Sequence, residues 1–268
     1  MDVRSMLAQL DALYGKGDLK TAETCLDRWL EEAFEQRSWG AVLTIYNEME
    51  GLYRTTGRAD KAAGISDDAL DLIEKLGLCN TIHHATTLQN GATANRVAGN
   101  MRKALNLYRQ AAQIYTSTGA VKSYQMASLY NNISHIYQHF NEHDKALEYL
   151  KQALELVSAE TDSEAEIATT YTGMALSYMA INDLENAENC ISKAMGYYNS
   201  DSGSTDGHRG SALSAVGELY WHKKDYVKAL YAFERALEFT LKVFGENDGC
   251  RVIRQNIELI KKDMQTEL

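Results

Sequence analysis

Two pairs of polar side chains recur in this sequence at the same interval. Asn90 and Asn132 are 42 residues apart, and so are Arg54 and Arg96. A carboxamide offers both a hydrogen-bond donor and an acceptor, which suits the N–H and C=O groups of an extended peptide. A pair of guanidinium groups can hold a carboxylate or a phosphate by two-pronged hydrogen bonds. These four residues are therefore candidates for holding an extended chain with an acidic group.

Each pair also has a plainer interpretation. Asn90 and Asn132 could simply belong to a solvated helix face, which is polar in any case. Asparagine is a poor helix former, however, and this favours a binding role for the pair. Arg54 and Arg96 could instead pair with local acids such as Glu48 or Glu50. Both interpretations of each pair stay open at the level of the sequence.

His135 and His139 are four residues apart, a spacing that metal ligands use on a helix. No third ligand is obvious, because His143 lies beyond an expected turn at Asn141. We therefore interpret both histidines as polar surface residues and expect no metal and no other cofactor. The sequence also lacks the GxxxxGKS or GxxxxGKT, GxGxxG, HExxH and GxSxG motifs, so we expect no enzymatic activity.

The composition sets limits on the class of protein. The chain has 268 residues, 45% of them hydrophobic and 24% charged, and no proline. Such a chain is typical of a soluble globular protein, and the lack of proline favours uninterrupted helices. The net charge of -10 disfavours binding to nucleic acid or to an anionic membrane. The first residues lack a signal peptide and the four cysteines are scattered, so we expect a cytoplasmic protein with reduced thiols.

The elements that would position the candidate residues are repeated along the chain. The segment HDKALEYLKQAL at 143–154 has near copies elsewhere, and their common alanine recurs every 40 to 42 residues. Even spacing in this range indicates a solenoid or an array of repeats. The recurring alanines are Ala22, Ala62, Ala104, Ala146, Ala187 and Ala229.

The columns around each alanine predict two helices joined by a tight turn. Positions four and seven residues later lie on the same face of a helix because of their spacing, and they hold mostly apolar or small residues. Five residues before the alanine stands a residue suited to end a helix in the left-handed conformation, usually glycine or asparagine. The residue after it, often Asp or Asn, can cap the next helix. The predicted turn residues are Gly17, Gly57, Gly99, Asn141, Asn182 and Lys224.

We predict an all-α fold, an α-α superhelix of about six helical hairpins in a single domain that spans residues 1–268. A terminal helix over 248–265, with apolar residues at Val252, Ile253, Ile257 and Ile260, would cover the last hairpin. The hairpins are predicted at residues 3–36, 41–76, 83–116, 125–158, 166–199 and 208–243.

The order of residue types in each unit resembles the tetratricopeptide repeat (TPR): a small residue, a tyrosine, a Gly-Asp type of turn, an alanine, a bulky residue and a second alanine. The segment 130–154 carries this pattern best. The usual repeat has about 34 residues. The longer period here resembles the kinesin-light-chain-like branch, as do Asn131-Asn132 and VFGENDG at 243–249. Four positions depart from the pattern: Trp29, where alanine recurs in other units, Glu50 and Ser66, where packing residues are expected, and Asn95, where other units have tyrosine or leucine.

In this family the first helix of each hairpin lines a concave groove, and inward asparagines hold bound peptides. The resemblance therefore implies a TPR solenoid that binds a protein or peptide segment, with Asn90 and Asn132 in those positions. Trp221 would be a hydrophobic anchor in the groove or a residue partly buried between repeats. Neighbouring positions of the same surface hold Asn47, Glu48 and Thr93. The binding residues implied in this way are Asn90, Asn132, Asn131, Arg54, Arg96, Gln89, His135, Gln138 and Trp221.

The resemblance also leaves alternatives. The inward positions contain no lysine, which disfavours the carboxylate clamp of co-chaperones in this family. The chain could be a peptide-responsive regulator that resembles bacterial TPR pheromone receptors, although we expect no DNA-binding segment before the first hairpin. It could also be a structural homo-oligomer in which another copy of the chain occupies the groove.

Overall fold

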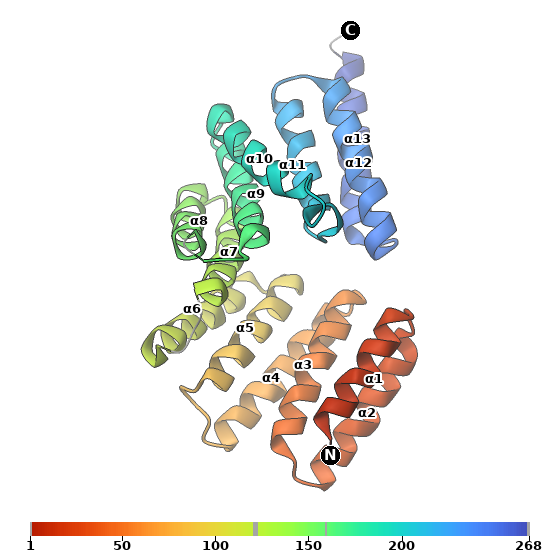
Figure 1. Ribbon diagram of the computed structural model, residues 1–268, viewed down its shortest axis with the longest axis vertical. Coiled ribbons are helices and arrows are strands. Elements are labelled where there is room, and N and C mark those ends of the chain that lie inside the picture. The colour runs from red at the N-terminus through yellow and green to blue at the C-terminus, as the bar shows by residue number, and fades with distance from the viewer. Residues whose placement is uncertain (1, 120–122, 159, 267–268) are drawn as a thin grey trace. The chain divides into compact units, whose positions relative to one another are not determined.

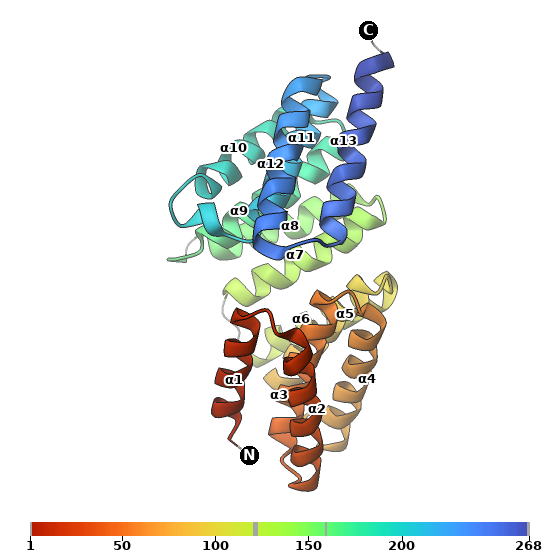
Figure 2. The same cartoon turned by 90° about the vertical axis from the view of Figure 1, so that its right-hand side faces the viewer.

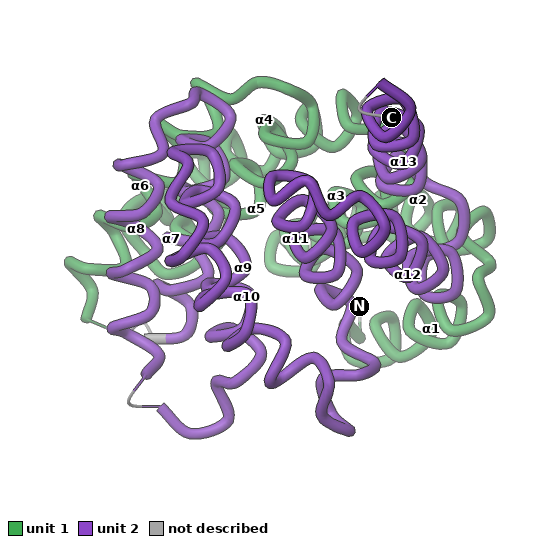
Figure 3. The backbone as a smooth tube through the Cα atoms, turned by 90° about the horizontal axis from the view of Figure 1, so that it is seen from above, with its two compact units in different colours: residues 1–121 green, residues 122–268 purple. Residues whose placement is uncertain are grey.

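The structure, a computed structural model, describes residues 2–119, 123–158 and 160–266. All regular elements in this part of the chain are helices, thirteen α-helices and one short 3-10 helix, which confirms the predicted all-α class. None of these helices is both long enough and apolar enough to cross a membrane. The chain divides into two compact units, residues 1–121 (unit 1) and residues 122–268 (unit 2), which Figure 3 distinguishes by colour. That all the hairpins form a single domain stays a prediction.

Unit 1 consists of three helical hairpins whose successive helices lie side by side (Figure 1). The first helix of the second hairpin, α3, also contacts the first helix of the third, α5. These two helices therefore expose their side chains on a common surface. The bounds are α1 (Val3–Gly15), α2 (Leu19–Glu35), α3 (Trp39–Thr55), α4 (Ala59–Lys75), α5 (Ile82–Val97) and α6 (Met101–Thr118).

Unit 2 repeats this arrangement with three more hairpins and adds a terminal helix. The first helices α7, α9 and α11 contact one another in that order. The terminal helix α13 lies along α12 (Figure 2). The bounds are α7 (Ser123–His139), α8 (His143–Val157), α9 (Glu164–Ala180), α10 (Leu184–Tyr198), η1 (Gly203–Thr205), α11 (Arg209–His222), α12 (Tyr226–Phe244) and α13 (Asp248–Thr266).

A single residue with positive φ forms the turn inside each hairpin, at the six positions predicted. The residue after it donates its backbone N–H to the carbonyl five residues earlier, as Glu142 does to Tyr137 at 2.9 Å. This is the Schellman arrangement that ends helices at a left-handed residue. Lys224 adopts it with φ of 59° although it is neither glycine nor asparagine. The six residues are Gly17, Gly57, Gly99, Asn141, Asn182 and Lys224.

The predicted helix caps are present in only some of the hairpins. The carboxylates of Asp18, Asp183 and Asp225 each accept a hydrogen bond from the backbone N–H three residues later. Asn100 does not cap with its side chain. Its amide instead donates to Asn95 Oδ1 at 3.3 Å, because Asn95 is fully buried and its amide needs polar partners.

The recurring alanines are all fully buried, and the positions four and seven residues later are buried as well. Small residues on the first helices make room for the bulky members of these columns. A Cβ atom on Gly217 of α11 would lie only 2.6 Å from Cδ2 of Phe233 in α12. The close approach of the helices therefore depends on residue size at these positions.

The terminal helix α13 covers the last hairpin with one apolar face. Ile253, Ile257 and Ile260 pack in a cluster with Phe233 of α12, as predicted. Val252 was expected in this face but is 47% exposed. Cys250 is fully buried on α13. The apolar face therefore follows a helical stripe that passes through position 250 and not through position 252.

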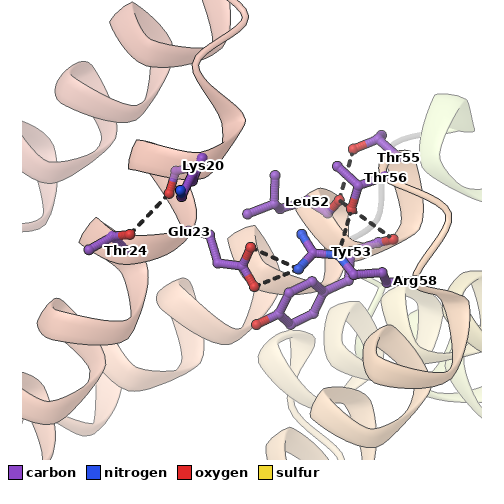
Figure 4. A network of polar contacts seen from close by, with 8 residues as sticks. All are labelled: Lys20, Glu23, Thr24, Leu52, Tyr53, Thr55, Thr56 and Arg58. Carbon is purple, nitrogen blue, oxygen red and sulfur yellow. Dashed lines mark hydrogen bonds and ion pairs between the residues drawn. The ribbon is translucent and has the colours of Figure 1, made fainter.

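Polar contacts also join neighbouring hairpins of unit 1 (Figure 4). Arg58, at the start of α4, binds both carboxylate oxygens of Glu23 in α2, at 2.6 and 2.8 Å. Its guanidinium carbon lies 4.6 Å from the ring centroid of Tyr53. The contact fixes α2 against the α3–α4 turn and leaves Arg58 fully engaged.

Candidate functional site

Polar side chains form a stripe along each of the adjacent helices α3 and α5. Their spacings of three, four and seven residues keep each stripe on one side of its helix. We call the two stripes together the α3–α5 face. All of its members are half-buried, so each is held by neighbours and still reaches solvent. The members are Asn47, Arg54, Thr86, Gln89, Asn90, Thr93 and Arg96.

An amide pair joins the two helices at the centre of this face. Asn90 Nδ2 donates a hydrogen bond to Asn47 Oδ1 at 2.9 Å. The other amide atoms of the pair, Asn47 Nδ2 and Asn90 Oδ1, have no hydrogen-bond partner among the described residues. The pair therefore presents one spare donor and one spare acceptor from a fixed geometry.

Tyrosine hydroxyls from α6 hold the rest of the α5 stripe in place. Tyr115 donates to Gln89 Oε1 at 3.2 Å, and Tyr108 is hydrogen-bonded to the hydroxyl of Thr93 at 2.8 Å. Both tyrosines are buried. The side chains of Gln89 and Thr93 are therefore ordered before any ligand arrives, which lowers the entropic cost of binding.

Two arginines extend the α3–α5 face beyond the amide pair. Arg54 makes no hydrogen bond or ion pair with a described residue, and the buried Nε atom of Arg96 has no hydrogen-bond partner there. Burial raises the pKa of Tyr108, whereas its bond to Thr93, the charge of Arg96, a hydrogen bond from Arg96 and the charge of Arg54 lower it. Both guanidinium groups thus lie near one hydroxyl and keep unused donors. An ion pair with Glu48 or Glu50 is not seen in the described part of the chain.

A pocket of about 420 Å³ opens between the N-terminal halves of α3 and α5. Trp39, Leu43 and Leu78 supply apolar walls, and Thr44 and Asn47 supply polar ones. This volume falls in the range of small-ligand pockets. Because Asn47 belongs to both features, the pocket adjoins the amide pair.

Acidic groups lie on the side of α3 that is next to α1. Burial, and then the charge of Asp11, raise the pKa of Glu48. Burial raises the pKa of Tyr14 to about 12, and the charges of Glu48 and Asp11 contribute. The surface of unit 1 is therefore acidic beside α1 and basic at Arg54 and Arg96.

Asn131 of α7 is buried and forms hydrogen bonds inside unit 2. It is only 5% exposed, and its Nδ2 donates to Glu166 and, at 2.9 Å, to Thr170, both in α9. Burial raises the pKa of Glu166, which the hydrogen bond from Asn131 partly opposes. The amide thus ties α7 to α9 and does not face solvent.

The other predicted residues of α7 are also engaged within unit 2. Gln138 Nε2 donates to the Gly173 carbonyl and to Ser177 Oγ, both at 2.8 Å. His135 Nδ1 lies 3.0 Å from Gln138 Oε1. Asn132 is half-buried and donates to the Ser128 carbonyl of its own helix at 3.0 Å. Asn132 and His135 thus have partners on α7 itself, whereas Gln138 also reaches α9.

The indole of Trp221 takes part in docking α13. Its Nε1 donates to Asp263 Oδ2 at 2.9 Å, and its ring packs against the cluster that contains Phe233 and Ile257. Trp221 is half-buried, which agrees with the second of the two sequence interpretations, a residue partly buried between repeats. Around His135 and His139, as elsewhere in the described chain, no three His, Cys, Asp or Glu side chains are placed to hold a metal ion.

Sequence reasoning placed Asn47 on the same surface as Asn90 but did not foresee their bond. The spacing of 43 residues, one more than the usual repeat period, was the available signal. The sequence marked Glu50 as out of place. It did not show that Glu50 would be buried in α3, one helical turn from Arg54.

A family profile for the tetratricopeptide repeat matches residues 83–159 and 166–242, which is more than half of the chain. No curated protein matches the sequence at a significant level.

Three solved structures show similar folds at low sequence identity. BtubC (BKLC) from P. vanneervenii has a TM-score of 0.64 and 20% identity, covering 87% of this chain and 93% of its own. NprR in complex with its cognate peptide NprX has a TM-score of 0.74 and 14% identity, covering 94% of this chain and 71% of its own. Repeats from Podospora anserina described as those of a kinesin light chain have a TM-score of 0.58 and 17% identity, covering 75% and 95%.

Proposed function

Because the chain belongs to the tetratricopeptide repeat family, we propose that it is a non-enzymatic scaffold that binds a peptide or protein segment. We propose further that the α3–α5 face of unit 1 makes the central contacts. The similar fold of NprR was solved with a peptide bound, which supports a peptide as the ligand.

The observation that carries this proposal is the amide pair of Asn47 and Asn90. An extended peptide leaves its main-chain N–H and C=O groups in need of partners. Asn90 Oδ1 would accept from one such N–H, and Asn47 Nδ2 would donate to one such C=O. Their mutual bond of 2.9 Å holds both atoms in position, so little side-chain entropy is lost on binding.

The neighbouring features would add specificity to main-chain capture. Arg54 and Arg96 have unused donors that suit a carboxylate or phosphate of the ligand. The pocket beside Asn47 would receive an uncharged side chain, since its walls are mostly apolar residues and threonines and contain no Asp, Glu, Lys or Arg. Gln138 and Trp221 are left out of the proposed contact set because their donor groups are already bound within the protein, and Asn131 is left out because its side chain is only 5% exposed. Asn132 stays a proposed contact through its Oδ1 atom.

The test is selection from a displayed library of random short peptides, followed by calorimetric titration with the enriched peptides. The double variant Asn47→Ala/Asn90→Ala removes both amides, so neither is left without its partner. We expect a loss of affinity of about tenfold or more, since two hydrogen bonds contribute about 0.5–1.5 kcal/mol each. Asn106→Ala, an exposed asparagine of α6, is the matched control. Equal enrichment and affinity for wild type and the double variant would reject the α3–α5 face as the site.

A second candidate function is a regulator that changes shape when the peptide binds. The similar fold of NprR, which covers 94% of this chain, was solved with its cognate peptide, so a peptide is the ligand with which to look for such a change. Small-angle scattering with and without a selected peptide would test it. A scattering profile that does not change at saturation would exclude a shape change and leave the passive scaffold.

A further inference from the structure

Glu50 is a buried carboxyl group with no partner in unit 1. It is 3% exposed, and neither of its oxygens has a hydrogen-bond partner among the described residues. Other repeats place small or apolar residues at this position, such as Ala92, Ala175 and Gly217. A buried carboxylate without a partner is strongly disfavoured relative to its neutral acid. Burial accordingly raises the pKa of Glu50 to about 8, although the charge of Arg54 opposes the rise.

The charged groups around Glu50 come from the helices packed against α3. Arg54, four residues later, lies on the same side of α3 and favours the carboxylate. Asp67 of α4 disfavours the carboxylate, but it is paired with Lys103 of α6 at 2.7 Å. On the other side of α3, the carboxylate of Glu23 in α2 is bound to Arg58.

On the α5 side, Arg96 is the only Lys, Arg, Asp or Glu of that helix, and its charge acts with that of Arg54 on Tyr108. Arg58 and Arg54 differ in whether they have a counter-ion. Arg58 has the Glu23 carboxylate at 2.6 Å as its counter-ion. Arg54 has no ion pair with a described residue, and the nearest acid on its own helix holds a proton near neutral pH. The positive charge of Arg54 is therefore not compensated locally while Glu50 is protonated.

We propose that Glu50 is a proton-controlled counter-ion of the anion site formed by Arg54 and Arg96. While Glu50 keeps its proton, the two guanidinium groups are available to a carboxylate or phosphate of the ligand. When Glu50 releases its proton to solvent, its carboxylate competes with the ligand anion for Arg54. By linkage, anion binding at moderately alkaline pH is accompanied by uptake of a fraction of a proton at Glu50. This inference rests on the proposed function for the identity of the ligand, but it can be tested without a peptide.

The probe is sodium sulfate, because sulfate stays a dianion over the whole pH range of the test. Its affinity is measured by titration calorimetry at constant ionic strength, at about pH 6.5 and about pH 9.5, on either side of the Glu50 transition. We expect wild-type affinity to fall about tenfold between the two conditions, since a unit charge appears one helical turn from Arg54. We expect Glu50→Gln to bind sulfate with the same affinity at both pH values. Arg54→Gln should bind weakly at both, and Arg102→Gln, an exposed arginine of α6, should behave as wild type.

Carboxyl-carbon NMR of the wild type gives a second readout that does not depend on any variant folding well. The Glu50 signal should titrate near pH 8, and saturating sulfate should move its midpoint upward. The same fall in sulfate affinity in Glu50→Gln, or no Arg54-dependent sulfate binding at either pH, would overturn the inference. If sulfate behaves as expected while no peptide requires Asn47 and Asn90, the proposed peptide site fails and the proton-controlled anion site stands.

Discussion

The indole N–H of Trp221 on α11 is hydrogen-bonded to the carboxylate of Asp263 on α13, at a distance of 2.9 Å. The two residues are 42 positions apart, one repeat period, so α13 meets α11 much as a further repeat would. The terminal helix is thus held by a directional bond in addition to its apolar face of Ile253, Ile257 and Ile260. Trp221 is consequently part of the end of the array and not a free anchor for a ligand.

Trp221→Phe should loosen α13 without affecting peptide binding. The phenyl ring keeps most of the packing but loses the N–H donor, at a cost of about 1 kcal/mol in the free energy of unfolding. Urea unfolding and amide hydrogen exchange in α13 would measure it. Asp263→Asn, which keeps an acceptor oxygen, is the milder control. A variant with unchanged stability and weakened peptide binding would instead favour Trp221 as an anchor.

Glu50 should make the stability of the protein depend on pH. Its pKa is about 8 in the folded state, against an ordinary value of 4.5. Because the folded-state pKa is the higher one, the stabilisation is complete below about pH 4.5 and is lost as pH rises through 8. The loss is on the order of 3–5 kcal/mol at most.

The measurement for Glu50 is urea unfolding of wild type and Glu50→Gln across this pH range. The difference between the two proteins separates the effect of Glu50 from the effects of buried Glu166 and half-buried Glu218, whose pKa values burial also raises. Glu50→Gln should be the more stable protein at alkaline pH. Parallel curves for the two proteins would show that Glu50 is not the group that titrates.

Adding a methyl group should have opposite effects at two helical glycines. The Cβ of Gly217→Ala would lie 2.6 Å from the ring of Phe233, which is 1% exposed and has little room to move. We expect a loss of about 1–3 kcal/mol. Gly64→Ala in α4 meets no atom within 4 Å and should gain about 0.5–1 kcal/mol from helix propensity. Thermal unfolding of both variants measures this, and effects of equal sign would contradict the packing described for α11.

Tyr137 of α7 should be a core residue of unit 2. It is 4% exposed and stacks on Tyr149 of α8, with ring centroids 5.5 Å apart. Tyr137→Ala should cost about 3–5 kcal/mol, as for other buried aromatic residues. Tyr124→Ala on the same helix, where the side chain is 51% exposed, should cost less than about 0.5 kcal/mol. Urea unfolding that gave similar values for both variants would place Tyr137 outside the core.

The repeat pattern was sufficient for the helices and their turns because both depend on short-range physics. The left-handed turn at Lys224 was predicted from its place in the repeat, and the 6→1 bond from Asp225 N–H to the Tyr220 carbonyl confirms it. The buried alanine columns followed from helical periodicity alone. Such features depend only on residues within one or two turns of the helix, and these residues are close together in the sequence.

The tertiary structure determines which partners the polar side chains bind. Asn90 and Asn131 occupy first helices and have the same chemistry, yet Asn90 pairs at a half-buried surface and Asn131 is bound inside by Glu166 and Thr170. Sequence spacing could not separate them, because a polar group takes whichever partner lies within hydrogen-bonding distance, and that partner here belongs to another repeat. The charge of Glu50 likewise depends on its burial, a property of the packed helices and not of the residue.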